Sequence, residues 1–312
     1  MFRGQKRIPS TILIFGAAAR IGGPLARFLR REAPQVQLRL ATSNPENCEI
    51  LRREHPHAQV VLASYFDLPS LETAVDGMEG VFILTTSGTD EAKAMTNLVV
   101  LLRNANNVVH VLRLLGMQPE ANLRRVPQSL REHGLGLPIQ HPVAKKILDE
   151  SNLPVTYLNI GATFMDNFFW MKEGLRRERK LIWPERLIPY IDPREIAEVA
   201  GRLFMSDDHR HIGQFHTLNN GQDILRFSEV ADLMSEVFEE KIAYDGQRES
   251  FFKEYQHLGE VRLKYLWNFF QYERENEVVW SRNDFVERVL GRKPLSLSGW
   301  LAEHQKRLML VT

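Results

Sequence analysis

The sequence predicts an α/β fold in which helices cover both faces of a doubly wound parallel sheet. Short apolar runs rich in β-branched residues alternate with amphipathic helical stretches over the first half of the chain. These runs are apolar at nearly every position, which is typical of strands buried on both faces. Their alternation with helices indicates parallel pairing. We expect strands at residues 11–15, 37–42, 59–64, 80–86, 107–116 and 154–160.

The helices between these strands are predicted from residue spacing. Ile21, Leu25 and Leu29 recur at helical spacing after the first strand. Pro24 is tolerated there because it lies in the first turn. Residues 116–140 interrupt the alternation without a clear strand, and we interpret them as a lid over the site. The expected helices cover residues 21–32, 44–54, 69–78, 90–105 and 142–151.

The character of the chain changes after Gly161. Residues 164–171 (FMDNFFWM) are densely aromatic, and residues 188–205 predict a strand followed by an amphipathic helix. We therefore divide the chain into a sheet domain at residues 1–161 and a smaller, mostly helical part at residues 162–312, with segments that return to the sheet.

Composition excludes several classes of protein. The chain holds 40 Lys and Arg against 39 Asp and Glu, so no basic field attracts nucleic acid or an anionic membrane. No apolar stretch reaches the length of a membrane-spanning helix and no signal peptide is evident, so we expect a cytoplasmic protein. A single cysteine, Cys48, excludes an intramolecular disulfide, and His209, His211 and His216 lack the patterned partners of a metal site. Oligomeric state, monomer or homodimer, stays open.

The strongest functional signal is the segment GAAARIG at residues 16–22, directly between the first strand and the first helix. Free amides and the dipole at a helix start bind a diphosphate, and small residues let it approach closely. In a Rossmann fold the first βα turn holds the diphosphate of a dinucleotide; the alternative is a tight turn that binds nothing. Ala19 stands where the middle glycine is usual, which weakens binding without abolishing it if φ there is negative. The expected contacts are Gly16, Ala18, Ala19, Arg20, Ile21 and Gly22.

With this loop in place, the chain resembles the NmrA-like family of atypical short-chain dehydrogenase/reductases. Residues 16–22 are similar to that family's GATGxxG loop, and LPVTYLNIGATFMDNF at residues 153–168 is similar to its GLPYTILRPGxFMxN segment. The segments SLETAVDGMEGVFILTT, IPYIDPREIAEVA and NDFVERVLGRKPLSLSGWLAEH fit the same pattern. The resemblance implies an NAD(P)-binding Rossmann domain with a small substrate-binding C-terminal part. The family includes reductases of aromatic or quinone-like molecules and non-catalytic regulators that sense the cofactor.

The chain departs from this family at the groups that carry catalysis. No tyrosine has a lysine four positions later, and His141-Pro-Val-Ala-Lys145 occupies the equivalent helix. Because these positions share a helix face, we expect Lys145 at the nicotinamide ribose and His141 orienting the substrate or donating a proton. The alternative is a helix-end histidine and a solvated lysine. Leu114 and Leu115 replace the family's serine pair, which leaves an apolar floor without a hydroxyl.

The residues after the second strand bear on the choice between NAD and NADP. No acidic residue for NAD follows that strand, and the family's arginine position holds Ser43. Thr42, Ser43 and Asn44 can donate hydrogen bonds to a 2′-phosphate, with Arg20 within reach. This favours NADP over NAD; the alternative is that Ser43 or Asn44 simply caps the next helix, which is compatible with either cofactor.

The remaining predicted contacts follow the third, fourth and sixth strands. Ser64 and Tyr65 occupy the family's Asp-Leu position, and Tyr65 is expected to stack on adenine. Thr85, Thr86 and Ser87 are expected to bind the ribose and phosphate. Gly161 and Phe164 complete the cofactor set. Leu115, Phe164, Met165, Phe168 and Phe169 are predicted to line an apolar substrate pocket, unless the aromatic cluster packs one part of the chain onto the other.

Together these features predict an NAD(P)H-dependent reductase of a small apolar or aromatic quinone, carbonyl or imine. The alternative is a non-catalytic NAD(P)-binding redox sensor that acts through a protein partner, which the missing tyrosine, glycine, arginine and aspartate favour. An isomerase that uses the same fold is a third interpretation.

Overall fold

The computed structural model describes residues 4–118, 124, 126–133 and 137–310. The chain divides into two compact units. Unit 1 comprises Met1–Met117, Leu135–Ile160 and Pro193–Thr217, and unit 2 comprises Gln118–Gly134, Gly161–Asp192 and Leu218–Thr312. Each unit is described by itself below.

Unit 1 contains the parallel sheet that the apolar runs predict. Within the described ranges its strands are β1 (Thr11–Phe15), β2 (Gln37–Thr42), β3 (Gln59–Leu62), β4 (Gly80–Ile83), β5 (His110–Leu115), β6 (Val155–Ile160) and β10 (Phe215–Leu218). They form one seven-stranded sheet in the order β10-β6-β5-β4-β1-β2-β3. The pairs from β3 to β6 are all parallel. The strand order reverses between β1 and β4, which confirms the predicted doubly wound Rossmann fold.

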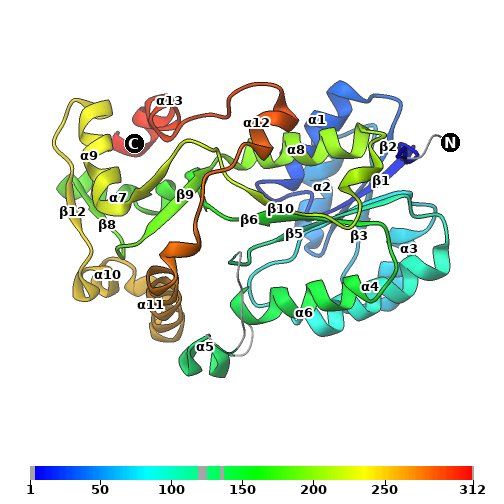
Figure 1. The fold of residues 1–312 in the computed structure, drawn as a ribbon, viewed down its shortest axis with the longest axis horizontal. Coiled ribbons are helices and arrows are strands. Elements are labelled where there is room, and N and C mark those ends of the chain that lie inside the picture. The colour runs from blue at the N-terminus through cyan, green and yellow to red at the C-terminus, as the bar shows by residue number, and fades with distance from the viewer. Residues whose placement is uncertain (1–3, 119–123, 125, 134–136, 311–312) are drawn as a thin grey trace. The chain divides into compact units, whose positions relative to one another are not determined.

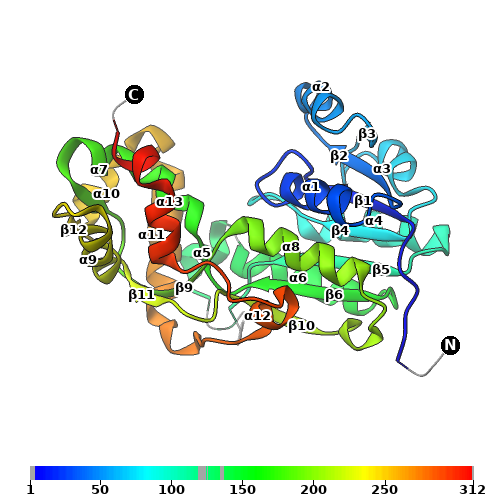
Figure 2. The same cartoon turned by 90° about the horizontal axis from the view of Figure 1, so that it is seen from above.

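Helices cover both faces of this sheet, as Figure 1 and Figure 2 show. The helices are α1 (Gly22–Glu32), α2 (Pro45–Glu54), α3 (Leu68–Val75), α4 (Glu91–Ala105), α6 (Leu137–Asp149) and α8 (Pro193–Met205). In Figure 1, α1 and α8 lie on one side of the sheet and α3, α4 and α6 on the other. Although α8 is distant in sequence from α1, the two pack closely because Gly201 leaves room for Phe28, whose Cε1 would lie 2.6 Å from a Cβ at that glycine.

Unit 2 combines helices with two small sheets among its described residues. One sheet joins β7 (Thr163–Phe164), β9 (Leu187–Ile191) and β11 (Ile224–Arg226), and the other joins β8 (Lys180–Ile182) and β12 (Ala243–Asp245). The α-helices are α5 (Gln128–His133), α7 (Lys172–Glu178), α9 (Phe227–Phe238), α10 (Arg248–Glu254), α11 (Glu260–Glu275), α12 (Phe285–Leu290) and α13 (Leu297–Met309). Short 3₁₀ helices occupy Met165–Trp170, Gln256–Leu258 and Glu277–Val279 here, and His209–His211 in unit 1.

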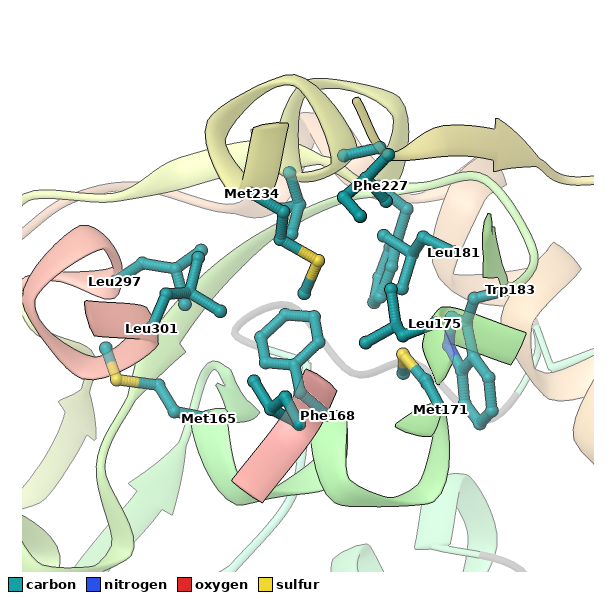
Figure 3. Packing of buried hydrophobic residues seen from close by; sticks show 14 of the residues in the cluster. Met165, Phe168, Met171, Leu175, Leu181, Trp183, Phe227, Met234, Leu297 and Leu301 are labelled. Carbon is teal, nitrogen blue, oxygen red and sulfur yellow. The ribbon is translucent and has the colours of Figure 1, made fainter. Parts of the chain in front are cut away.

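The core of unit 2 is built around Phe168. Its side chain is fully buried, and its ring centroid lies 6.0 Å from that of Tyr190, 6.1 Å from Trp300 and 6.3 Å from Phe227. Figure 3 shows the Phe168 ring in the middle of the labelled side chains, with Met234 nearby. Packed aromatic rings of this kind contribute both burial and ring–ring attraction.

Replacing Phe168 by alanine is expected to lower the free energy of unfolding by about 3–5 kcal/mol, because the cavity that it leaves cannot collapse fully. Chemical denaturation measures the loss. Trp170→Ala is the matched control, since that side chain is 49% exposed in the same short helix. An equal loss in both variants would contradict the central place of Phe168.

One predicted boundary needs correction. The helix expected over residues 142–151 is α6, which begins at Leu137 and holds Pro142 inside it, so a proline that we placed at the helix start lies within the helix. The C-terminal part is mostly helical as predicted, and β7, β8, β9, β11 and β12 form its two small sheets. The strand and helix expected over residues 188–205 agree with β9 (Leu187–Ile191) and α8 (Pro193–Met205).

Candidate functional site

The loop between β1 and α1 is shaped by two glycines that have no room for a side chain. Gly16 has a φ of 66°, and a Cβ there would overlap the Leu84 side chain. Gly22 packs against the loop itself. A Cβ on Gly22 would overlap the Gly16 carbonyl oxygen and lie 2.8 Å from the Gly16 carbonyl carbon and 2.9 Å from Ala17 Cα. Since backbone atoms cannot rotate away, the loop keeps this shape only with glycine at position 22.

The start of α1 fits an anion. The N-cap residue, Ile21, makes no side-chain cap hydrogen bond, and the first turn of this described helix contains no acidic residue. Ala18 and Arg20 are exposed beside it. Ala19 is not among the described non-glycine residues with a positive φ, so its methyl group adds no backbone strain. The loop and the helix start therefore fit the diphosphate of a dinucleotide.

Side chains at the end of β2 and directly after it make hydrogen bonds in the turn that leads into α2. Asn44 is the N-cap of α2, where its side chain accepts a hydrogen bond of 3.0 Å from the Glu46 amide. Thr42 is buried, and its hydroxyl accepts a hydrogen bond of 3.2 Å from the Asn44 amide. Ser43 and Asn44 are both exposed, and of these two the Asn44 side chain is engaged in capping α2.

Tyr65 lies across the ends of two strands. Its hydroxyl donates to the Leu84 carbonyl oxygen at 3.1 Å, and its ring centroid lies 4.6 Å from that of Phe15. The Ser64 hydroxyl accepts from the Phe66 amide at 3.2 Å, which shapes the turn after β3. Adenine stacking by Tyr65 stays a prediction, and any such stacking would use the ring edge or face that Phe15 leaves open.

A buried ion pair joins Glu91, the first residue of α4, to Arg113 in the middle of β5. Arg113 Nη2 lies 2.6 Å from Glu91 Oε1 and donates to Thr85 Oγ1 at 3.0 Å, and the Thr85 hydroxyl donates to the same carboxylate oxygen. Thr86 and Ser87, the other predicted contacts after β4, are exposed. The sequence analysis missed Glu91 and Arg113. An arginine inside the otherwise apolar strand HVLRLL is the signal that indicates a buried partner.

His141 lies beside this ion pair. Its Nδ1 accepts a hydrogen bond of 2.7 Å from the Gly116 amide, and its Nε2 lies 3.8 Å from Glu91 Oε1. Burial, together with the charge of Arg113, lowers the pKa of His141 to about 3. The imidazole is therefore neutral at pH 7 with its hydrogen on Nε2. Proton donation by His141 stays a prediction, and this environment does not favour it.

Lys145 has different neighbours from His141. Its Nζ lies 2.6 Å from Asp149 Oδ2 and 4.7 Å from the centre of the Tyr157 ring. The Tyr157 hydroxyl donates to the same carboxylate, at 2.7 Å from Asp149 Oδ1. The ammonium also lies over the Phe215 ring, at 6.0 Å. His141 and Lys145 share α6, yet the groups that His141 contacts differ from those that Lys145 contacts.

The predicted residues that follow β6 belong to unit 2. Met165 and Phe168 are fully buried in its core, and Phe169 packs partly buried against Trp300 and Arg307. Met165 and Phe168 therefore belong to the internal core of unit 2. Phe164 is half-buried in β7, and Gly161 is buried.

The predicted lid is described only in part. Residues 119–123, 125 and 134–136 lie outside the described residues. The described portion contains α5, which packs on α11 within unit 2. Leu115, which precedes this stretch and was expected at the pocket floor, is buried in the core of unit 1. A lid role for residues 116–140 stays a prediction.

The histidines near the end of unit 1 pair with each other. His211 Nδ1 lies 3.1 Å from His216 Nε2. Among the described residues, no group of three or more His, Cys, Asp or Glu is arranged to hold a metal ion. In the same part of the chain, no helix has the length and apolar character needed to cross a membrane.

Comparisons with known proteins agree with this geometry. Residues 16–167 match a family model described as NAD(P)H-binding. The fold is similar to Citrobacter sp. triphenylmethane reductase complexed with NADP(H), at 19% identity and a TM-score of 0.76 over 94% of this chain and 99% of that one. It is similar to an NADPH-dependent quinone oxidoreductase from Escherichia coli, at 17% identity and a TM-score of 0.75 over 94% and 99% of the two chains.

A regulator shares the fold as well. NmrA, a negative transcriptional regulator crystallised in complex with NADP, is 14% identical, with a TM-score of 0.71 over 96% of this chain and 95% of that one. No curated protein sequence matches the chain significantly. The glycine loop, the strand order and the family match lead to one conclusion: residues 16–167 match an NAD(P)H-binding domain, and the chain has a Rossmann fold similar to those of NmrA and the two reductases.

Proposed function

We propose that the chain binds a nicotinamide dinucleotide at the carboxyl ends of the strands of unit 1 and uses it to reduce a small apolar or aromatic compound. One observation carries the binding step: residues 16–22 form a loop that has no room for a Cβ at Gly22 and that leads into an uncapped helix start. The reduced cofactor supplies a hydride when bound. The loop amides hold the diphosphate, and the backbone after β4 and β5 frames the other half of the ligand.

NADP is the form that this proposal favours. Arg20 and Ser43 are both exposed, and residues 43–45, which directly follow β2, contain no acidic residue; the first one, Glu46, lies in the first turn of α2. Both side chains can donate hydrogen bonds to phosphate oxygens. NAD is the alternative, and titration with both reduced dinucleotides compares the two directly.

The side chains near the ends of β4 and β5 limit the substrate class. Hydrogen bonds and an ion pair join the side chains of Thr85, Glu91 and Arg113, and His141 is neutral. The proposed acceptors are therefore compounds that take a hydride without a proton from a side chain. A triarylmethyl cation becomes neutral on gaining a hydride, and a quinone gives a resonance-stabilised anion that water protonates. Met165 and Phe168 are left out of the proposed pocket because both are fully buried.

The purified protein is expected to oxidise NADPH with a quinone or a triphenylmethane dye, and at least about 100-fold more slowly with a simple aldehyde. The reason is that an alkoxide needs a general acid, which contributes about 10²–10⁴-fold in rate. Absorbance of NADPH follows the reaction. A preference for aldehydes over quinones and dyes would contradict the proposed substrate class.

A sensor is the second candidate, and the same internal bonding near β4 and β5 favours it. In that case the protein binds dinucleotide without turnover of any acceptor and changes its affinity for a protein partner. Binding of NADPH with no oxidation across the panel, together with capture of a partner that depends on cofactor, supports the sensor over the reductase.

A further inference from the structure

Glu91 and Arg113 are almost completely removed from solvent. Their side chains are 1% and 0% exposed, and Arg113 Nη2 lies 2.6 Å from Glu91 Oε1. Removing two charges from water costs several kcal/mol for each ion, so a buried pair is weak evidence for a stabilising role. Glu91 Oε2 and two nitrogens of Arg113, Nε and Nη1, have no hydrogen-bond partner within the described residues, which adds to that cost. A pair at this position calls for an explanation other than stability.

The pair joins four segments of unit 1. Glu91 begins α4, Arg113 belongs to β5, and the Thr85 hydroxyl after β4 donates to the Glu91 carboxylate. His141 of α6 brings its Nε2 to 3.8 Å from the same oxygen while its Nδ1 holds the Gly116 amide at the end of β5. Glu91 therefore fixes the backbone that follows both β4 and β5.

These two strands belong to one half of the doubly wound sheet. Each half of such a sheet binds one mononucleotide, and the adenosine side is the β1–β3 half, because the residue that reads its ribose follows β2. The half that contains β4, β5 and β6 is left for the nicotinamide nucleotide. This step rests on the proposed function, since it requires that the chain binds the dinucleotide at all.

The charge of the nicotinamide ring differs between the two forms of the cofactor. The oxidised ring carries a positive charge and the reduced ring carries none. A buried charge without a counterion acts strongly over several ångströms because the protein interior screens poorly. Arg113 alone would repel the oxidised ring, whereas Arg113 neutralised by Glu91 would not.

We propose that Glu91 balances the charge of Arg113 beneath the nicotinamide half of the bound dinucleotide and so sets the preference of the protein between oxidised and reduced cofactor. Glu91 also acts as a positioning residue, because it holds Thr85 and, through His141, Gly116. Neither residue transfers a proton or contacts the reacting atoms in this proposal.

Dissociation constants of NADP⁺ and NADPH for wild-type and Glu91→Gln protein test the proposal. The neutral glutamine leaves the Arg113 charge unbalanced, so the ratio of the constant for NADP⁺ to that for NADPH is expected to rise about tenfold. The matched control is Glu273→Gln in unit 2, where Glu273 Oε2 lies 2.7 Å from Arg186 Nε and the two side chains are 10% and 4% exposed. That variant loses a carboxylate of another largely buried ion pair, and its ratio is expected to equal that of the wild type.

A double variant keeps the proposal testable if Glu91→Gln does not fold. Glu91→Gln with Arg113→Met removes both charges, which buried sites tolerate better than the loss of one partner. We expect both dissociation constants to rise by a similar factor, with the wild-type ratio restored. An unchanged ratio in folded Glu91→Gln, or wild-type affinity for both forms in the double variant, would overturn the proposal. Failure of the wild type to bind either form would instead overturn the proposed function and this inference with it.

Discussion

Gly22→Ala is expected to raise the dissociation constant for NADPH by at least about 100-fold. The new Cβ would overlap the Gly16 carbonyl oxygen and approach Gly16 C at 2.8 Å and Ala17 Cα at 2.9 Å. Since all three are backbone atoms, the loop has to open, and its amides then move away from the diphosphate. Two lost hydrogen bonds to a charged group, at about 1.5 kcal/mol or more each, account for that factor. Calorimetric or fluorescence titration measures it.

Gly23→Ala is the matched control, with the same substitution one residue further along α1. A Cβ at Gly23 would lie 3.3 Å from the Ala17 carbonyl oxygen, and its next neighbour, at 3.5 Å, is the mobile end of the Arg27 side chain. Its affinity for NADPH is expected to stay within about threefold of the wild type, because small shifts relieve these contacts. Circular dichroism confirms that both variants are folded. Equal affinities for the two folded variants would disprove the role of the loop at residues 16–22.

The sheet and its glycine loop could be predicted from the sequence because their signals are local. β1 and β2 occupy the residues that the apolar runs indicate, and residues 16–22 lie between a strand and a helix as expected. The buried face of α8 was also readable, since its apolar residues recur at helical spacing. In each case, the residue pattern and the strand, loop or helix that it predicts lie in the same continuous stretch of the chain.

The polar network of unit 1 could not be predicted in this way. Glu91 and Arg113 are joined only because β4 and β5 pair in the sheet. In the sequence Glu91 reads as part of an ordinary helix start, and the arginine within a buried strand indicates a partner without identifying it. His141 and Lys145 were correctly placed on one helix, but helical spacing does not specify partners. Lys145 pairs with Asp149, and His141 accepts a hydrogen bond from the Gly116 amide. These neighbours determine the direction of each side chain.

The aromatic segment after β6 shows the same difficulty for apolar residues. Its density of rings is equally consistent with a pocket wall and with a core. Phe168 is buried because Tyr190, Phe227 and Trp300 surround it, and these partners come from segments up to the last helix of the chain. Only the tertiary packing of those segments distinguishes the two interpretations.

The free energy of unfolding is expected to fall steeply as the pH drops from 6.5 to 5. Burial lowers the pKa of His110 and of His141 to about 3 in the folded protein, with smaller effects from Lys6 and Arg113 respectively. In the unfolded chain both titrate near 6.5, so below that pH the unfolded state binds protons that the folded state does not. Stability is therefore fully present above pH 6.5 and is lost by about 1.4 kcal/mol per pH unit for each histidine until the folded pKa is reached.

Single variants assign this slope to the two histidines. Chemical denaturation of His141→Gln at several pH values is expected to give a slope smaller than that of the wild type by the contribution of one histidine, because glutamine does not titrate. The same holds for His110→Gln, in which Thr156 loses the ring nitrogen now 2.9 Å from its hydroxyl. His57→Gln, which makes the same substitution at an exposed position, is the matched control. Comparison of slopes cancels every other titrating group, so a wild-type slope in His141→Gln would mean that this imidazole binds protons equally in the folded and unfolded states. A neutral His141 leaves Arg113 as the only charged partner of the Glu91 carboxylate among the described residues.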